Sequence, residues 1–179
     1  MKIDLKQISQ HIKWLGLSLN KYSADSRINR VQESTTISIT LEPIQIGLRK
    51  PVKSICKLKY KDENIINKPV FWEFREKWQL LVSAKKQLSQ YEFCDLNIKL
   101  SDVSNFEFLS MHWTYPCPAS TTYQPHWHLS SGGSRFYLNK IHFPINHSWR
   151  DYYPGDMNEY QGWLEGFLNF LYLEFPRCL

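Results

Sequence analysis

The chain has 179 residues and a formal net charge of +5, and 42% of its residues are hydrophobic and 15% aromatic. A chain of this length and apolar content folds as one unit around one core. We therefore predict a single α+β domain over residues 1–179 and exclude a disordered chain. The modest positive charge permits a nucleic acid or an acidic protein as a partner without requiring either.

The cysteines and the N-terminal residues bear on the cellular compartment. Cys56, Cys94, Cys117 and Cys178 lie far apart, without a C-x-x-C pair, which argues against a zinc knuckle and a small disulfide scaffold. The first residues lack the apolar stretch of a signal peptide, and no later stretch approaches the ~20 apolar residues that span a bilayer. The sequence therefore predicts reduced thiols, a cytoplasmic location and no membrane partner.

Helices are predicted at the two ends of the chain. Residues 4–20 open with Asp4 as N-cap and Gln7 in a capping box, and Asp156 and Glu159 begin a C-terminal helix in the same way. Apolar residues then repeat at helical spacing along one face of each helix. They are Ile8, Ile12, Leu15 and Leu19 in the first, and Tyr160, Trp163, Leu164, Phe167, Leu168 and Leu171 in the second.

The residues between the helices favour strands. Residues 20–33 are polar and predict a loop, after which an apolar residue recurs at every second position from Ile37 to Leu41. A change of phase after Pro43 predicts a β-bulge at residues 42–43. Further strands are predicted at 52–60, 93–100, 106–114, 126–130 and 135–143.

Residues 69–90 allow two predictions. Phe74, Trp78, Leu81 and Leu88 share one face of a helix, and we predict a helix. The alternative is a hairpin that uses Trp72, Phe74, Leu80 and Val82. The predicted fold is an α+β domain in which a mainly antiparallel, twisted sheet of five or six strands is packed on one side by the N- and C-terminal helices.

Five of the six histidines lie between His112 and His147. This segment therefore has the densest group of side chains that can bind a metal or transfer a proton. His126 and His128 are two residues apart, so on a strand both rings project from the same face. Such an H-x-H pair can present two imidazoles to one metal ion or one phosphate. The candidate site therefore centres on this pair, with His112 and His142 on neighbouring predicted strands.

In one interpretation the site is a metal centre. His126, His128 and either His142 or His112 would bind a divalent transition metal and leave one position for water. Alternation along the strand places Glu107 on the opposite face from His112, so no carboxylate is expected to join the ligand set.

Two other interpretations need no metal. In the first, His126, His128 and His112 are catalytic and act as general acid and base on a phosphodiester, while Arg135 and Lys140 bind the phosphate. In the second, the histidines stack and hydrogen-bond within the fold and have no further role.

Basic residues form a second cluster, in which lysines alternate with apolar residues of the strand predicted at 52–60. If this face is open, Lys53, Lys57 and Lys59 are candidates for binding a phosphate backbone. Otherwise it is a solvated face whose lysines discourage edge-to-edge pairing. The full cluster is Arg49, Lys50, Lys53, Lys57, Lys59 and Lys61.

Two segments carry a resemblance to the 2H phosphoesterases. His112-Trp113-Thr114 and His128-Leu129-Ser130 resemble the H-φ-[ST] motif of that family, in which two histidines flank a phosphate and the hydroxyls bind its oxygens. The family carries its two motifs in separate, pseudo-symmetric lobes. Here the two lie close together in the sequence, which departs from that pattern.

A further resemblance covers residues 111–149. Pro125-His126-Trp127-His128 and the later His142-Phe143-Pro144 resemble the PHxH segment of small uncharacterised bacterial proteins from toxin–antitoxin and phage-defence neighbourhoods. The resemblance implies a prokaryotic protein that acts with a partner encoded nearby, and a toxin-like activity on RNA.

We therefore predict a nucleic-acid-directed protein of defence or toxin type, a ribonuclease or phosphodiesterase that uses the histidine-rich site. The alternative is a non-enzymatic subunit that binds other proteins in a larger complex through its aromatic surface.

Overall fold

The computed structural model describes residues 1–24, 26–44, 56–59, 69–81, 89–102, 104, 107–114, 126–129, 141–144 and 155–173. For residues 24, 108, 114, 126–129 and 141–144 the description covers the backbone.

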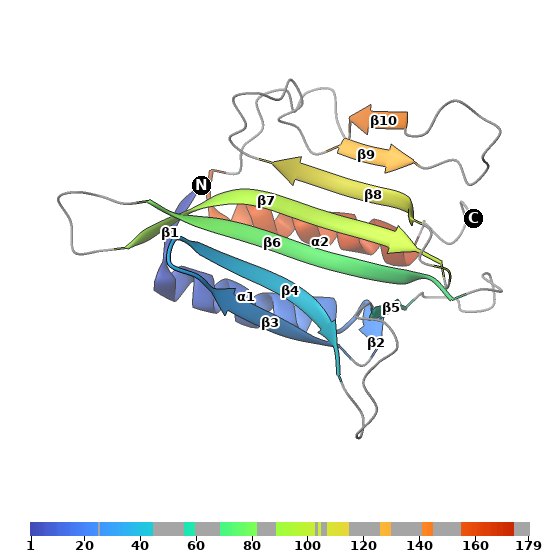
Figure 1. The fold of residues 1–179 in the computed structure, drawn as a ribbon, viewed down its shortest axis with the longest axis horizontal. Coiled ribbons are helices and arrows are strands. Elements are labelled where there is room, and N and C mark those ends of the chain that lie inside the picture. The colour runs from blue at the N-terminus through green and yellow to red at the C-terminus, as the bar shows by residue number, and fades with distance from the viewer. Residues whose placement is uncertain are drawn as a thin grey trace.

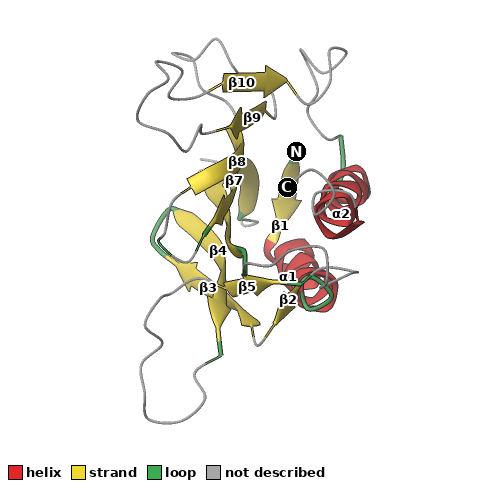
Figure 2. Ribbon diagram, turned by 90° about the vertical axis from the view of Figure 1, so that its right-hand side faces the viewer, coloured by secondary structure: helices red, strands yellow, loops and turns green. Residues whose placement is uncertain are grey.

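An antiparallel sheet forms one layer of the molecule, and two helices lie together on one of its faces (Figures 1 and 2). The main path of the sheet has the order β10-β9-β8-β7-β6-β4-β3. Its strands are β3 (Ser26–Gln32), β4 (Thr36–Pro43), β6 (Phe71–Leu81), β7 (Gln90–Ser101), β8 (Glu107–Thr114), β9 (His126–Leu129) and β10 (Ile141–Pro144).

Three short strands join the sheet beside this path. β1 (Lys2–Asp4) pairs with the first residues of β7. β5 (Cys56–Leu58) pairs with β2 (Ser23–Ala24) on one side and with the first residues of β6 on the other. The predicted α+β fold, a mainly antiparallel sheet packed by N- and C-terminal helices, is confirmed.

The two helices begin where their caps predict. In α1 (Leu5–Leu19) the Asp4 side chain accepts from the Gln7 amide at 2.7 Å, and the Gln7 side chain accepts from the Asp4 amide at 2.9 Å. In α2 (Met157–Leu173) the Asp156 carboxylate accepts from the amides of residues 158 and 159. Neither helix is both long and apolar enough to cross a membrane.

The core lies between the helices and the sheet face that they cover. Alternate strand residues point into it and are fully buried, and aromatic rings dominate its centre. The Tyr160 ring of α2 lies 5.2 Å from Phe93 of β7, and Trp163 lies 4.9 Å from Trp113 of β8, between ring centroids. Edge-to-face and tilted contacts of this kind anchor α2 on the central strands.

The helix predicted at residues 69–90 is wrong. Trp72, Phe74 and Leu80 of the alternative hairpin lie on one continuous strand, β6, and Val82 lies outside the described residues. β6 and β7 form a long antiparallel pair that runs from Phe71↔Ser101 to Leu81↔Gln90. Along β6 every second residue from Trp72 to Trp78 is buried and the residues between are exposed. Glu76 occupies one of the buried positions, and a charged residue there hides the period of two that identifies a strand.

Two smaller predictions in the N-terminal half are also wrong. Residues 20–33 contain β2 and β3 rather than only a loop; β3 ends the main path of the sheet, where a polar strand needs only one partner. The predicted bulge at residues 42–43 is absent from the β3–β4 pair, whose register is continuous from Gln32↔Ile37 to Ser26↔Pro43. The register shifts instead at residues 77–78 and 100–101.

Candidate functional site

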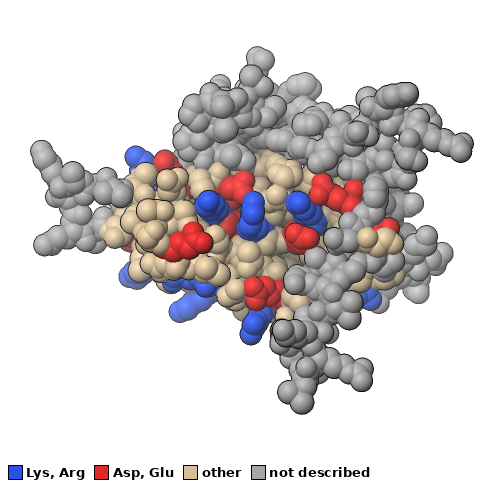
Figure 3. All heavy atoms as spheres, in the orientation of Figure 1, with Lys and Arg blue, Asp and Glu red and all other residues tan. Residues whose placement is uncertain are grey.

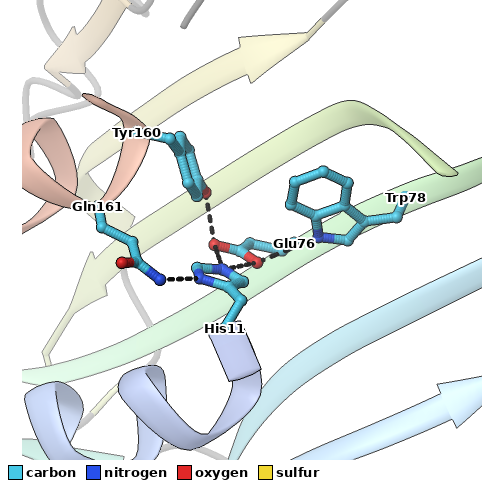
Figure 4. Close-up of polar contacts among 5 residues, drawn as sticks. All are labelled: His11, Glu76, Trp78, Tyr160 and Gln161. Carbon is cyan, nitrogen blue, oxygen red and sulfur yellow. Dashed lines mark hydrogen bonds and ion pairs between the residues drawn. The ribbon is translucent and has the colours of Figure 1, made fainter. Parts of the chain in front are cut away.

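A polar network lies inside the core, where α1, β6 and α2 meet (Figure 4). The carboxylate of Glu76 is 2.9 Å and 3.1 Å from Nε2 of His11, and it accepts hydrogen bonds from the Tyr160 hydroxyl and, at 3.3 Å, from Nε1 of Trp78. Glu76, His11 and Tyr160 are each 0% exposed. The network therefore joins the two helices to the central strand without contact with solvent.

A second contact orients the His11 ring. Its Nδ1 lies 3.0 Å from Nε2 of Gln161. A carboxylate only accepts, so Nε2 of His11 donates to Glu76. The carboxylate thereby receives three donors from three different segments. This satisfies the requirement that buried polar groups be hydrogen-bonded.

Burial raises the pKa of Tyr160 well above its usual value of 10.0, and the charge of Glu76 and the hydrogen bond to it raise it further. A raised pKa in the fold means that this group stabilises the protein below about pH 10, and that the stabilisation is lost as pH rises beyond it, by about 1.4 kcal/mol per pH unit.

Tyr160→Phe should therefore lower the free energy of unfolding by about 1–2 kcal/mol at pH 8 and should make its decline between pH 10 and 11 less steep than in the wild type. Chemical denaturation at pH 8, 10 and 11 measures both quantities. An equal decline in the two proteins would contradict the raised pKa of buried Tyr160.

The network is structural, because the helices cover it completely and a substrate could not reach it. Sequence reasoning missed both of its central residues. His11 falls between Ile8 and Leu15 on the apolar face of α1. This position was the one sign in the sequence that His11 would be buried. A histidine on a buried helix face needs a buried partner, and Glu76 on an apolar strand face is that partner.

The other face of the sheet is the candidate functional surface. In the described part of the chain, no helix covers it, and it is polar (Figure 3). Figure 3 shows basic side chains in a row across its centre with acidic side chains on both sides. Arg75 forms an ion pair of 3.1 Å with Asp95, and Lys99 forms one of 3.4 Å with Glu107.

The strand register brings four predicted site residues together on this face. His112 of β8 is directly opposite His126 of β9, and His128 of β9 is directly opposite His142 of β10. Directly opposed residues share a face, as do residues two apart on one strand. Met111 and Trp113 are fully buried on the helix side, so the four histidine positions belong to the sheet face opposite the helices. Ser110, on that face in the row of His128, is itself buried.

Rows of directly opposed residues run across the strands, from the histidines into the inner strands. One row passes from Arg75 through Asn97 to His112 and His126, and the next passes from Glu73 through Lys99 and Ser110 to His128. By strand register, the histidine positions are therefore continuous with Arg75, Glu73 and Lys99.

Glu107 lies on this open face, contrary to the prediction from alternation. Its carboxylate accepts from the Ser110 hydroxyl at 2.8 Å and pairs with Lys99, and both of these residues are in the row of His128. The register shift is the cause: Ser101 is opposite Glu107 and Leu100 is opposite Leu109, and the extra residue of β8 between them reverses the alternation of faces.

The predicted phosphate-binding residues divide between the described and undescribed parts of the chain. Lys57 is exposed on β5, between the buried Cys56 and Leu58, as the predicted alternation requires. Nζ of Lys59 contacts a backbone carbonyl of the α1 terminus at 3.5 Å. Arg49, Lys50, Lys53, Lys61, Arg135 and Lys140 lie outside the described residues.

Among the described side chains, no group of three or more His, Cys, Asp or Glu residues could hold a metal ion. The side chains of β9 and β10 lie outside that set, so the predicted metal ligands His126, His128 and His142 are placed by register alone.

The described thiols have no catalytic features. Burial raises the pKa of both Cys56 and Cys94 to about 11, which keeps them protonated at neutral pH.

Comparison of the chain with protein-family models, with curated proteins and with solved structures finds no match.

Proposed function

We propose that the open sheet face around His112, His126 and His128 binds nucleic acid and hydrolyses its phosphodiester bonds. One observation carries the proposal. The register gathers four histidine positions from three adjacent strands on the face that the helices leave open. The remaining described histidine, His11, is fully buried on the other face.

Histidine suits this reaction because an imidazole gains and loses a proton near neutral pH. One group removes a proton from water as its oxygen bonds to phosphorus. One P–O ester bond breaks, and a second group gives a proton to the departing oxygen. The products are a phosphomonoester and a free hydroxyl.

Arg75 and Lys99 are the described cations that would position the phosphate. Their side chains are 56% and 38% exposed, and each is paired with a carboxylate on the same face. Exposed ion pairs of this kind contribute only about 0–1 kcal/mol. A phosphate can therefore replace the carboxylate partner at small cost and form a charge-assisted hydrogen bond.

RNA is the substrate that we propose. The net charge of +5 favours a polyanion, and the resemblance of residues 111–149 to proteins of toxin and defence neighbourhoods points to RNA. On this proposal the protein is a toxin-type or defence nuclease.

An NMR titration tests whether the open face binds RNA. The imidazole resonances are followed while a short 2′-O-methyl oligonucleotide is added, and gel electrophoresis after the titration checks that it is intact. Those of His112, His126, His128 and His142 should shift together with a single affinity, and buried His11 serves as the internal control. If these four resonances do not move at millimolar oligonucleotide, the proposal is wrong and a protein-binding role becomes the better one.

A further inference from the structure

We propose that Lys77, Ser38 and Thr40 form a second phosphate-binding subsite on the sheet face opposite the helices. The subsite holds the backbone phosphate next to the one at Arg75. The inference rests on the proposed function, because it extends the RNA-binding surface of the same face. The three residues lie on the adjacent strands β4 and β6, and the structure describes their side chains.

Strand register places the three residues together. Ser38 of β4 is directly opposite Lys77 of β6, and Thr40 is directly opposite Arg75. Directly opposed residues lie about 4.5–5.5 Å apart between Cα atoms. The residues on either side of each hydroxyl, and on either side of Lys77, are buried against the helices. All three side chains therefore point to the opposite face.

Lys77 differs from Arg75 and Lys99 in having no carboxylate partner. Arg75 pairs with Asp95, and Lys99 pairs with Glu107. In the part of the chain that the structure describes, no hydrogen bond or ion pair engages the exposed Lys77. Its ammonium group therefore binds an incoming phosphate without first releasing a carboxylate.

The two hydroxyls are also available. Thr36, the other hydroxyl residue on this face of β4, donates to Glu33 at 2.9 Å. Among the described residues, no hydrogen bond engages the side chain of Ser38 or Thr40. The subsite therefore offers one positive charge and two hydroxyl donors, which are groups that proteins direct to backbone phosphates.

The carboxylates that border the subsite each have a cation. Glu42, two residues from Thr40 along β4, lies 3.6 Å from Arg27. Asp95, directly opposite Lys77 on β7, is the partner of Arg75. Because both carboxylates are paired, Lys77 leaves an excess of positive charge at this place, which favours a phosphate over a neutral ligand.

The spacing of the cations suits an RNA backbone. Lys77 and Arg75 are two residues apart on β6, which corresponds to about 7 Å between Cα atoms. Cations at such intervals follow the backbone of an extended single strand. Arg75 is in the row of His112, and Lys77 is in the neighbouring row. A strand with one phosphate at Arg75 therefore places the next at Lys77.

Binding of two short oligonucleotides tests the inference. A 2′-O-methyl dinucleotide contains one phosphate, and the matching trinucleotide contains two. Affinities are measured from the His112 imidazole and from the backbone amides of β4, and phosphorus NMR checks that each probe stays intact. Lys77→Ala should weaken binding of the trinucleotide about fivefold and leave binding of the dinucleotide unchanged, because only the second phosphate reaches Lys77.

The hydroxyls and the charge have separate readouts. Ser38→Ala and Thr40→Val should each weaken the trinucleotide about two- to tenfold. With a longer 2′-O-methyl oligonucleotide, Lys77→Ala should reduce the slope of log affinity against log salt concentration by about 0.7. Lys13→Ala, which removes the same charge from the exposed surface of α1, is the matched control and should change neither quantity.

Equal affinity of the wild type and Lys77→Ala for the trinucleotide, or an equal loss for both probes, would overturn the inference. If the probes are cleaved, KM for the trinucleotide should rise about fivefold in Lys77→Ala with kcat unchanged, and an unchanged KM would overturn it. Histidine shifts that do not depend on Lys77 refute this inference alone. Lys77-dependent binding that leaves the histidines unmoved refutes the proposed function and leaves the subsite intact. No binding of either probe at millimolar concentration refutes both.

Discussion

Replacement of Glu76 by alanine should lower the free energy of unfolding by about 3–5 kcal/mol. The Glu76 carboxylate accepts hydrogen bonds from His11, Tyr160 and Trp78 inside the core. Its removal leaves three buried donors without an acceptor and a cavity between the helices and β6. An unsatisfied buried donor alone costs about 1–3 kcal/mol.

The measurement is chemical denaturation followed by tryptophan fluorescence, which is suitable because Trp72, Trp78 and Trp113 are buried. Glu73→Ala is the matched control, since Glu73 is exposed on the same strand, and it should change the free energy by about 0.5 kcal/mol or less. Glu76→Gln should fall between the two, because it keeps one acceptor oxygen. A loss below about 1 kcal/mol for Glu76→Ala would contradict the role assigned to the network.

Glu76 also explains why a helix was wrongly predicted at residues 69–90. Both helices and most strands could be predicted, because their apolar residues follow one clear period and their caps are local signals. In β6 the buried carboxylate of Glu76 replaces an apolar residue, and its partners His11 and Tyr160 are distant in the sequence. A local pattern cannot show that a charge will be satisfied by residues far along the chain.

The candidate site could be predicted only in part. The H-x-H spacing placed His126 and His128 on one face, because alternation is local. The pairing of His112 with His126 depends on which strands are neighbours and on their register, which the sequence does not specify directly. Glu107 is the clearest case of a prediction that failed. Strict alternation places its side chain on the face opposite His112, but one bulge in β8 brings its carboxylate to the same face.

Replacement of both His126 and His128 by asparagine should lower the rate of RNA cleavage by about 10³-fold or more. Loss of a positioned general acid or base costs about 10²–10⁴-fold. Folding should be preserved, because both positions lie on the face opposite the core. We expect the free energy of unfolding to change by about 1 kcal/mol or less.

The most direct test of the central claim, that this open histidine-bearing face hydrolyses nucleic acid, is the rate of cleavage of a 5′-labelled single-stranded RNA. Wild type, the double variant and Lys13→Ala, a change on the exposed surface of α1, are compared at equal concentration. The account predicts cleavage by the wild type and by Lys13→Ala, and a loss of about 10³-fold or more in a folded double variant. Equal cleavage by the double variant, or none by the wild type, would contradict it.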